Sequence, residues 1–175
     1  MSLRITGGEA RGRIVRQPVL DGVRPTSSRV REALFSMIGQ DLSGLTVLDA
    51  FGGSGLLGLE AWSRGANVVI VERRPHIARA IRDTAADLGA TVDVKVGDVL
   101  TLGPSLGRYD VLLCDPPYAH DAGEVLTRLG PLVRGQMVYE SDAKASLPQI
   151  SGPLTLDRVR RFGGTALWLY LGEQP

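Results

Sequence analysis

The strongest constraint on the fold is a regular alternation of apolar strands and amphipathic helices that begins at residue 45. One predicted strand contains the uninterrupted run Val68-Val69-Ile70-Val71, which leaves no polar face for solvent. Apolar strands that alternate with helices are typical of a parallel sheet covered by helices on both faces. The sequence therefore predicts a Rossmann-like, doubly wound α/β domain. Its expected strands are 45–51, 67–72, 91–96 and 109–114, with helices from the glycine-rich stretch after residue 51 to about residue 64 and over 75–88.

The C-terminal part of the chain is predicted to close the sheet with an antiparallel edge. A helix is expected over 121–132 and a short strand over 136–140. Two final strands, 155–161 and 165–171, are joined by Phe162-Gly163-Gly164, and such a glycine turn is typical of a β-hairpin. The predicted sheet is therefore mostly parallel, with a hairpin at its C-terminal end.

The N-terminal segment is rich in arginine. Residues 1–31 hold seven arginines and two acids, a local net charge of +5, whereas the whole chain has a net charge of +1. A basic patch of this kind is typical of a surface that meets a polyanion, although the arginines could instead pair with acids of the domain body. The candidate RNA-binding residues are Arg4, Arg11, Arg13, Arg16, Arg24 and Arg29.

A helix is expected directly after this basic segment. Thr26 or Ser27 can cap its first turn, and apolar residues then recur at the spacing of one buried helix face, at Val30, Ala33, Leu34, Met37 and Ile38. We therefore divide the chain into a basic extension over 1–24 and a domain over 25–175. The extension is expected to form a small strand pair or an extended arm.

A glycine-rich loop follows the first strand of the alternating region. Gly53, Gly55 and Gly58 have the spacing G-x-G-x-x-G, and Glu72 ends the next strand, where a carboxylate can bind ribose hydroxyls. This pattern alone fits a nicotinamide dinucleotide and S-adenosylmethionine equally well, because both contain adenosine. Asp49 favours S-adenosylmethionine, since a carboxylate before the loop would repel a pyrophosphate but attract an ammonium or a sulfonium. A capping or turn aspartate is the alternative for Asp49.

Another carboxylate is expected at the end of the third strand. Asp98 can accept a hydrogen bond from an adenine amino group while Val99 packs on the ring, and a simple turn aspartate is the alternative. The predicted cofactor is S-adenosylmethionine, which leaves as S-adenosylhomocysteine. The predicted cofactor-binding residues are Asp49, Gly52, Gly53, Ser54, Gly55, Glu72, Arg73, Asp98 and Val99.

The most specific local motif is Asp115-Pro116-Pro117-Tyr118, which directly follows an apolar strand. Two successive prolines fix φ and remove two backbone donors, so the chain must leave the sheet in a rigid, extended form. The carboxyl ends of strands are where open α/β sheets place their sites. The motif therefore predicts a stiff loop that presents a carboxylate, an unpaired Pro116 carbonyl and an aromatic face.

These groups suit methyl transfer to the exocyclic amino group of a nucleobase, a poor nucleophile because its lone pair is delocalised into the ring. The Asp115 carboxylate and the Pro116 carbonyl can accept its two N–H groups, which turns the lone pair toward a methyl donor. Tyr118 can stack on the flipped base, a contact worth about 1–3 kcal/mol. Asp115 can also stabilise charge on the nitrogen and accept the released proton. The predicted catalytic residues are Asp115, Pro116, Pro117 and Tyr118; a rigid structural turn is the alternative.

Cysteine and histidine give no sign of a metal site or of a covalent nucleophile. Cys114 is the single cysteine, and its place inside an apolar strand indicates a buried residue rather than an attacking thiol. His76 and His120 lie far apart in the sequence without a ligand pattern, so no metal is expected. No apolar run approaches the roughly 20 residues of a membrane span, and no signal peptide is evident. We expect a cytoplasmic monomer with no membrane partner.

On these residues the sequence resembles the RsmD-type methyltransferases, which methylate N2 of a guanine in bacterial 16S ribosomal RNA. The resemblance covers nearly the whole chain. The glycine loop and the Asp-Pro-Pro-Tyr motif are shared with many amino methyltransferases, whereas Arg24-Pro25-Thr26 followed by Arg-Val-Arg-Glu-Ala-Leu-Phe over 29–35 is much narrower. The other matching segments are 4–8, 11–13, 48–51, 53–55, 58–61, 63–66, 71–72 and 115–118.

The resemblance implies a class I S-adenosylmethionine-dependent methyltransferase fold with seven strands. It implies 16S rRNA as the substrate, within the small ribosomal subunit or an assembly intermediate. It also implies that the cofactor lies on Asp49, the 53–55 loop, Glu72 and Asp98, and that catalysis falls to 115–118. Three departures from the family pattern, none in the inferred reaction centre, are Gly53 for Ala, Ser28 for Asp and Gly164 for a polar residue.

Two other functions are compatible with parts of the sequence. The same motif serves in DNA adenine-N6 methyltransferases, but a chain of 175 residues lacks an evident target-recognition domain. An RNA-binding assembly factor with an inactive cofactor pocket is the non-enzymatic alternative, and the intact Asp115-Pro116-Pro117-Tyr118 motif argues against it.

Overall fold

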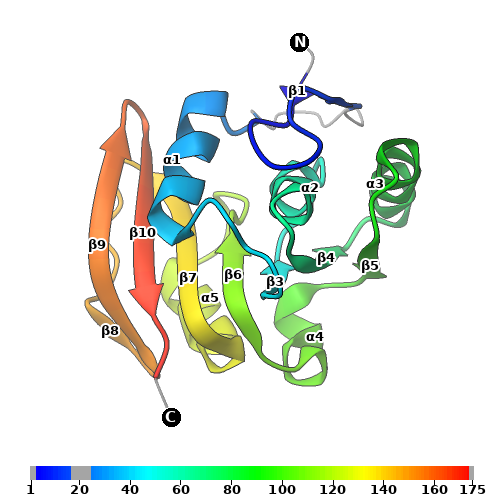
Figure 1. Ribbon diagram of the computed structural model, residues 1–175. Helices are drawn as coiled ribbons and strands as arrows, with labels where there is room; N and C mark the ends of the chain where they lie inside the picture. Colours follow the sequence, from blue (N-terminus) through cyan, green and yellow to red (C-terminus); the bar gives the residue numbers. More distant parts are fainter. Residues whose placement is uncertain (1–2, 17–24, 174–175) are drawn as a thin grey trace.

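The computed structural model describes residues 3–16 and 25–173 and shows a central twisted sheet with helices on both faces (Figure 1). The sheet has the strand order β5-β4-β3-β6-β7-β10-β9-β8. The first five strands of this order are parallel, and β10 is antiparallel to both of its neighbours. The strands are β3 (Thr46–Asp49), β4 (Asn67–Glu72), β5 (Val92–Val96), β6 (Tyr109–Cys114), β7 (Val133–Asp142), β8 (Ile150–Ser151), β9 (Leu154–Phe162) and β10 (Thr165–Leu171). The predicted α/β class with a C-terminal antiparallel hairpin is confirmed.

Two hydrophobic layers flank the sheet because successive side chains of each strand point to opposite faces. In β6, Val111 and Leu113 pack with α1, α2 and α3, whereas Leu112 and Cys114 pack with α4 and α5. The helices are α1 (Ser28–Ile38), α2 (Leu56–Ser63), α3 (Pro75–Leu88), α4 (Val99–Leu106) and α5 (Ala122–Leu129), the last continued by a 3-10 turn, η1 (Gly130–Leu132). Ser27 caps α1 by accepting a hydrogen bond from the Val30 N–H, as one of the two expected caps.

The structure departs from the predicted elements in four places, the first being strand β3, which is shorter than the predicted 45–51. Helix α4 was not expected, because Gly103 and Pro104 within it have low helix propensity. Asp98 caps its first turn. Strand β7 is longer at both ends than the predicted 136–140. The two-residue edge strand β8 brings the sheet to eight strands, one more than the family resemblance implied.

The N-terminal segment forms a short antiparallel strand pair, β1 (Leu3–Arg4) and β2 (Ile14–Val15), that packs on the domain. Its apolar residues join one hydrophobic cluster with residues of α2 and α3: Leu3, Ile5, Ala10 and Val15 meet Leu56, Leu59, Ala85 and Leu88. The proposed boundary at residue 24, together with Arg24, lies outside the described residues. Within the described part of the chain, no helix has the length and apolar character needed to cross a membrane.

A buried ion cluster joins this segment to α1 and α2. The Glu60 carboxylate on α2 accepts hydrogen bonds from Arg31 Nε at 3.4 Å, Arg64 Nη1 at 3.3 Å and the Thr6 backbone N–H at 2.7 Å. All three charged side chains are almost fully shielded from solvent. Arg31 also donates to the carbonyls of Thr26 and Arg4, at 2.6 and 2.8 Å. The Glu60 carboxylate thus joins the N-terminal segment, α1 and α2.

We predict that Glu60→Ala lowers the free energy of unfolding by about 3–5 kcal/mol, because two buried guanidinium groups lose their counter-ion. Urea denaturation measures this loss. The matched control is Glu124→Ala on α5, whose 3.1 Å pair with Arg128 is about half exposed and should contribute at most about 1 kcal/mol. Equal losses in the two variants would contradict the structural role of Glu60.

Candidate active site

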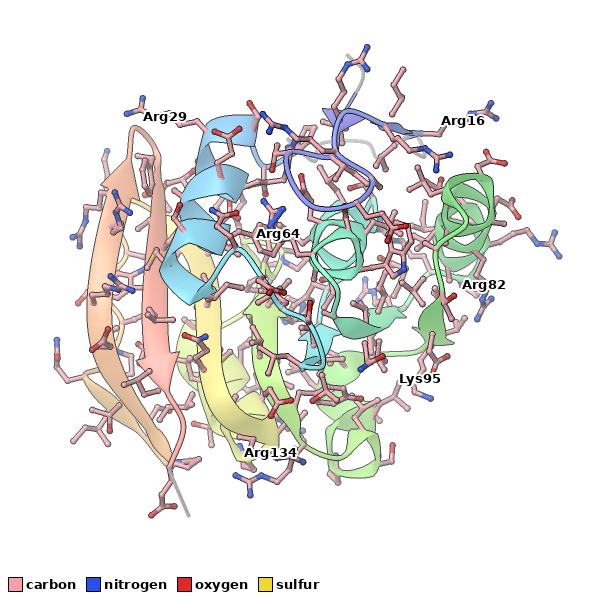
Figure 2. All side chains as sticks on the ribbon, in the orientation of Figure 1. Arg16, Arg29, Arg64, Arg82, Lys95 and Arg134 are labelled. Atoms are coloured by element: carbon pink, nitrogen blue, oxygen red, sulfur yellow. The ribbon has the colours of Figure 1, made fainter. Side chains whose placement is uncertain are left out.

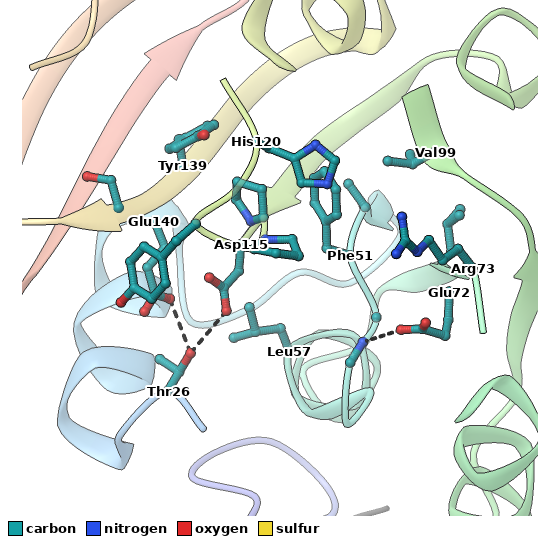
Figure 3. Close-up of a pocket in the computed structure, with 18 of the residues that line it drawn as sticks. Thr26, Phe51, Leu57, Glu72, Arg73, Val99, Asp115, His120, Tyr139 and Glu140 are labelled. Atoms are coloured by element: carbon teal, nitrogen blue, oxygen red, sulfur yellow. Dashed lines mark hydrogen bonds between the residues drawn. The ribbon is translucent and has the colours of Figure 1, made fainter. Parts of the chain in front are cut away.

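A cavity of about 1020 Å³ lies at the carboxyl ends of the parallel strands (Figure 3). All four predicted catalytic residues and seven of the nine predicted cofactor residues line it. The two that do not are Asp49 and Gly55, which lie behind the lining. The structure therefore brings together two motifs, the glycine loop and Asp115-Pro116-Pro117-Tyr118, that are about sixty residues apart in the sequence.

The glycines of the loop have two different roles. Gly53 takes a positive φ of 55°, and a Cβ there would meet only the Phe51 carbonyl oxygen, at 3.9 Å. A Cβ at Gly55 would come within 2.8 Å of Ile81 on α3, and one at Gly58 within 2.6 Å of Ile70 on β4. Gly55 therefore allows the loop to pack closely on α3, and Gly58 allows α2 to pack closely on the sheet, the role that the last glycine of such a fingerprint has. Only the first part of the loop borders the cavity.

Glu72 is held at the end of β4 by four donors, of which the longest is Arg74 Nη2 at 3.3 Å. Its carboxylate accepts hydrogen bonds from the Gly53 N–H at 2.9 Å and from the backbone and Nε of Arg74 at 2.9 and 2.8 Å. Burial alone would raise the Glu72 pKa, but these hydrogen bonds outweigh it and hold the pKa below its usual value. Glu72 is therefore an ionised carboxylate on the cavity wall.

Asp49 lies under the loop at the end of β3. Its Oδ2 accepts a hydrogen bond from the Gly58 N–H at 3.0 Å, and its buried Oδ1 accepts none from the described residues. Burial, with Asp115 nearby, raises the Asp49 pKa to about 7, although the Gly58 hydrogen bond opposes the rise. Asp49 thus anchors the start of α2, and its role toward a cofactor stays a prediction.

Three other predicted cofactor residues lie just after two of the strands. Arg73 follows β4, and Asp98 and Val99 follow β5. Asp98 is exposed and accepts the Leu100 N–H at 2.9 Å, so it is a helix cap, and it also lines the cavity. Val99 is buried behind it, and Arg73 extends along the same wall (Figure 3). A simple turn aspartate, the alternative interpretation of Asp98, agrees with its hydrogen bond to the Leu100 N–H. It does not account for the place of Asp98 on the cavity wall.

The Asp-Pro-Pro-Tyr loop leaves β6, the strand next to β3, and forms another part of the cavity wall. The Pro117 carbonyl accepts the His120 N–H at 3.0 Å, whereas the Pro116 carbonyl accepts no hydrogen bond from the described residues. Tyr118 is 88% exposed, so its ring does not serve as loop packing. Cys114 is buried, which raises its pKa well above the usual value and keeps it a thiol.

Two polar residues of this wall, Thr26 and Glu140, were not among the predicted site residues. The Thr26 hydroxyl lies 3.5 Å from Asp115 Oδ2 and 3.2 Å from Glu140 Oε2. Burial raises the pKa of Asp115 to about 6, and burial together with Asp115 raises that of Glu140 to about 8. The signal for Glu140 was present in the sequence, because it is the last residue of the expected apolar strand over 136–140. We predicted the strand but did not assign its last residue to the site.

Phe51 and His120 also line the cavity and were not predicted. Their rings are 5.5 Å apart and tilted by 52°, so they connect the glycine loop to the Asp-Pro-Pro-Tyr loop. Neither residue belongs to a motif with a fixed spacing. Only the fold brings them together.

The five predicted RNA-binding arginines that the structure describes, Arg4, Arg11, Arg13, Arg16 and Arg29, do not line the cavity. Figure 2 shows Arg16 beside α3 and Arg29 near the N-terminal end of α1. Arg13 donates to the carbonyls of Leu88 and Asp87, both at 2.8 Å, and so caps the end of α3. Arg4, Arg11, Arg16 and Arg29 are exposed. Arg31, which contributed to the positive charge of this segment, is instead buried against Glu60.

The fold is that of the class I S-adenosylmethionine-dependent methyltransferases. Magnesium protoporphyrin IX methyltransferase from Synechocystis, solved with bound S-adenosylmethionine, superposes with a TM-score of 0.69 at 17% identity, over 83% of this chain and 79% of that one. The structure of yhhF from Escherichia coli superposes with a TM-score of 0.85 at 31% identity over the full length of both chains.

Sequence comparison places the chain more narrowly. The family model described as conserved hypothetical protein 95 matches residues 3–171. Ribosomal RNA small subunit methyltransferase D of Escherichia coli is 32% identical over 179 residues, which cover 98% of this chain and 90% of that protein. The chain belongs to the RsmD family. No group of three or more potential metal ligands occurs among the residues that the structure describes.

We predict that the protein becomes less stable as pH rises from about 5 to about 8. Asp49, Asp115 and Glu140 have raised pKa values, so between their unfolded and folded values the native state binds more protons than the unfolded state. The free energy of unfolding then falls as these protons are lost. Urea denaturation across this range should show a shallower fall in Asp115→Asn/Glu140→Gln than in the unmodified protein. Parallel curves would contradict the prediction.

Proposed function

We propose that this protein transfers a methyl group from S-adenosylmethionine to the exocyclic N2 of a guanine in 16S ribosomal RNA, within the small ribosomal subunit or an assembly intermediate. The observation that carries the proposal is the opening of the glycine loop and the Asp115-Pro116-Pro117-Tyr118 loop into one cavity. A methyl donor and an amino acceptor must meet in line, so the two binding motifs have to share a space.

The cavity has the chemistry that a cationic adenosine cofactor needs. The ionised Glu72 beside Gly53 suits ribose hydroxyls, and Asp98 with Val99 suits an adenine ring. The acids around the cavity favour a ligand with a positive charge, and the unpartnered Oδ1 of Asp49 is a further acceptor close beneath the loop. We assign the cofactor to Asp49, Gly52 to Gly55, Glu72, Arg73, Asp98 and Val99. When bound, S-adenosylmethionine supplies an electrophilic methyl group.

The other wall provides the groups that hold the acceptor. The Asp115 carboxylate and the free Pro116 carbonyl accept the two N–H groups of the base, and the exposed Tyr118 ring stacks on its face. Pro117 stiffens the loop. A pKa of about 6 leaves Asp115 mostly ionised at neutral pH yet basic enough to take the proton that methylation releases.

The choice of substrate rests on the relatives. The curated relative from Escherichia coli is a ribosomal RNA small subunit methyltransferase, and the match extends through the basic N-terminal segment to the last strand of the sheet. The family resemblance supplies the guanine N2 position. Neither alternative function, DNA adenine methylation or an inactive assembly factor, gains a supporting observation from the structure.

The function is tested by supplying isotopically labelled S-adenosylmethionine with small ribosomal subunits from cells that lack the protein, and in parallel with duplex DNA. Label in 16S rRNA that maps to an N2-methylguanine is the expected result. Label confined to DNA adenine, or the absence of cofactor binding in calorimetry, would refute the proposal.

We predict that Asp115→Ala lowers turnover at least about 100-fold, because the amino group loses its charged acceptor. Cofactor binding measured by calorimetry should stay within a few-fold of normal, since Asp115 is not among the residues assigned to the cofactor. Near-normal turnover in this variant would remove Asp115 from the mechanism.

We predict that Arg11→Ala weakens RNA binding and reduces the slope of log K against log salt concentration by about 0.7–1, as expected for the loss of one phosphate contact. Arg11 is a cleaner probe than Arg13, whose loss would also uncap α3. Arg128→Ala, an exposed cation on α5, is the control and should leave the slope unchanged. Identical slopes for Arg11→Ala and the unmodified protein would remove Arg11 from the interface.

A further inference from the structure

Asp115 and Glu140 occupy equivalent places on neighbouring parallel strands. In the ladder between β6 and β7, Cys114 is paired with Tyr139, so the next residue on each strand is an acid. Both side chains turn toward Thr26, whose hydroxyl is 3.5 Å from Asp115 Oδ2 and 3.2 Å from Glu140 Oε2 (Figure 3). The two carboxyl groups therefore lie side by side on the wall assigned to the acceptor base.

When Asp115 and Glu140 are both ionised, the hydrogen bonds at this point do not balance. Thr26 has one hydroxyl hydrogen and can donate to only one acceptor at a time, whereas two ionised carboxylates present four oxygens. The protein supplies no second hydrogen bond to either carboxylate among the described residues. Buried acceptors without donors are costly, so this wall is best satisfied by a ligand that brings adjacent donors.

The nucleobases differ in whether they can supply such donors. On the Watson–Crick edge of guanine, the ring N1–H lies beside the 2-amino group, so two donors are adjacent. Adenine and cytosine place their amino group beside a ring nitrogen that carries a lone pair. That lone pair would face a carboxylate oxygen, and two acceptors in contact repel each other. A pair of carboxylates therefore matches guanine and disfavours the other amino-bearing bases.

We propose that Glu140 is a specificity-determining residue, which accepts the N1–H of the target guanine while Asp115 holds the neighbouring 2-amino group. This inference rests on the proposed function and deepens it, because it explains how the site selects guanine. Thr26 acts as a positioning residue that keeps the two carboxyl groups together. Its own place is fixed by the 2.6 Å hydrogen bond from Arg31 to its carbonyl.

The opposite protonation of Glu140 would give the opposite selectivity. A protonated Glu140 beside an ionised Asp115 presents one donor and one acceptor, the pattern that suits the ring nitrogen and amino group of adenine or cytosine. Guanine stabilises the ionised form through its N1–H, whereas the other two bases stabilise the protonated form. The base that the enzyme methylates therefore reports which form operates.

The experiment compares guanine with 2-aminopurine, which keeps the 2-amino group but has a bare N1. Small subunits are reconstituted with 16S rRNA that carries either base at the mapped target position, and kcat/KM is measured for each. The unmodified enzyme should prefer guanine by about 10- to 100-fold, the usual range for one hydrogen bond to a charged group. Glu140→Ala should bring this ratio close to one, mainly by losing activity on guanine. Glu140→Gln should also reduce the preference, because an amide can donate to a bare N1.

The controls separate a loss of specificity from a loss of structure. Glu124→Gln and Glu124→Ala on α5 change an exposed acid outside the cavity and should keep the full preference. Calorimetric cofactor binding of the Glu140 variants should stay near normal, and their unfolding midpoint should not fall below that of the unmodified protein, because the raised pKa of Glu140 already costs stability near neutral pH. A guanine preference that survives in both Glu140 variants would overturn the inference and leave the proposed function intact. No methylation of guanine subunits by the unmodified enzyme would overturn both.

Discussion

The ion pairs of the buried Glu60 carboxylate are the interactions on which the position of Thr26, beside Asp115 and Glu140, depends. The carboxylate neutralises Arg31 and Arg64 in the interior and binds the backbone of Thr6, so the N-terminal strand pair, α1 and α2 are tied to one charge. Arg31 extends this connection to the Thr26 carbonyl, and the Thr26 side chain meets Asp115 and Glu140. A continuous path of hydrogen bonds thus runs from the arginine-rich segment to the two acids. Removing one partner from such a path leaves an unpaired buried charge, which is why its members act as a unit.

Parallel strands explain why so many acids gather in one place. The carboxyl ends of β3, β4, β6 and β7 all open on the same edge of the sheet, and Asp49, Glu72, Asp115 and Glu140 lie at these ends. Three of them have raised pKa values because burial disfavours their charged form, whereas Glu72 is kept ionised by Arg74 and Gly53. Stability is sacrificed to hold these groups near the cavity, and a bound cation or an N–H donor would recover part of it.

Most of the fold could be predicted from the sequence, because glycines, prolines and apolar runs mark the ends of its elements. The ranges 67–72, 75–88 and 109–114 agree with β4, α3 and β6. Helix α4 was missed because local propensity at Gly103 and Pro104 contradicts the tertiary structure. Within the site, residues of both contiguous motifs line the same cavity. Phe51, His120, Thr26 and Glu140 were missed, since their proximity depends on strand order and register.

The roles of Arg13 and Arg31 could not be predicted either. A count of charges does not reveal which arginines form hydrogen bonds or ion pairs within the protein.

The exposure of Tyr118 has a kinetic consequence. Its ring already stands in solvent at the end of a loop whose two prolines leave little backbone freedom, so contact with a partner requires neither unpacking nor rearrangement of the main chain. A platform that is preformed in this way loses little entropy on docking, and most of the stacking energy can appear as affinity. Under the proposed function, the rate of productive binding would then be governed by how quickly the RNA extrudes its base, because the receiving surface is ready beforehand.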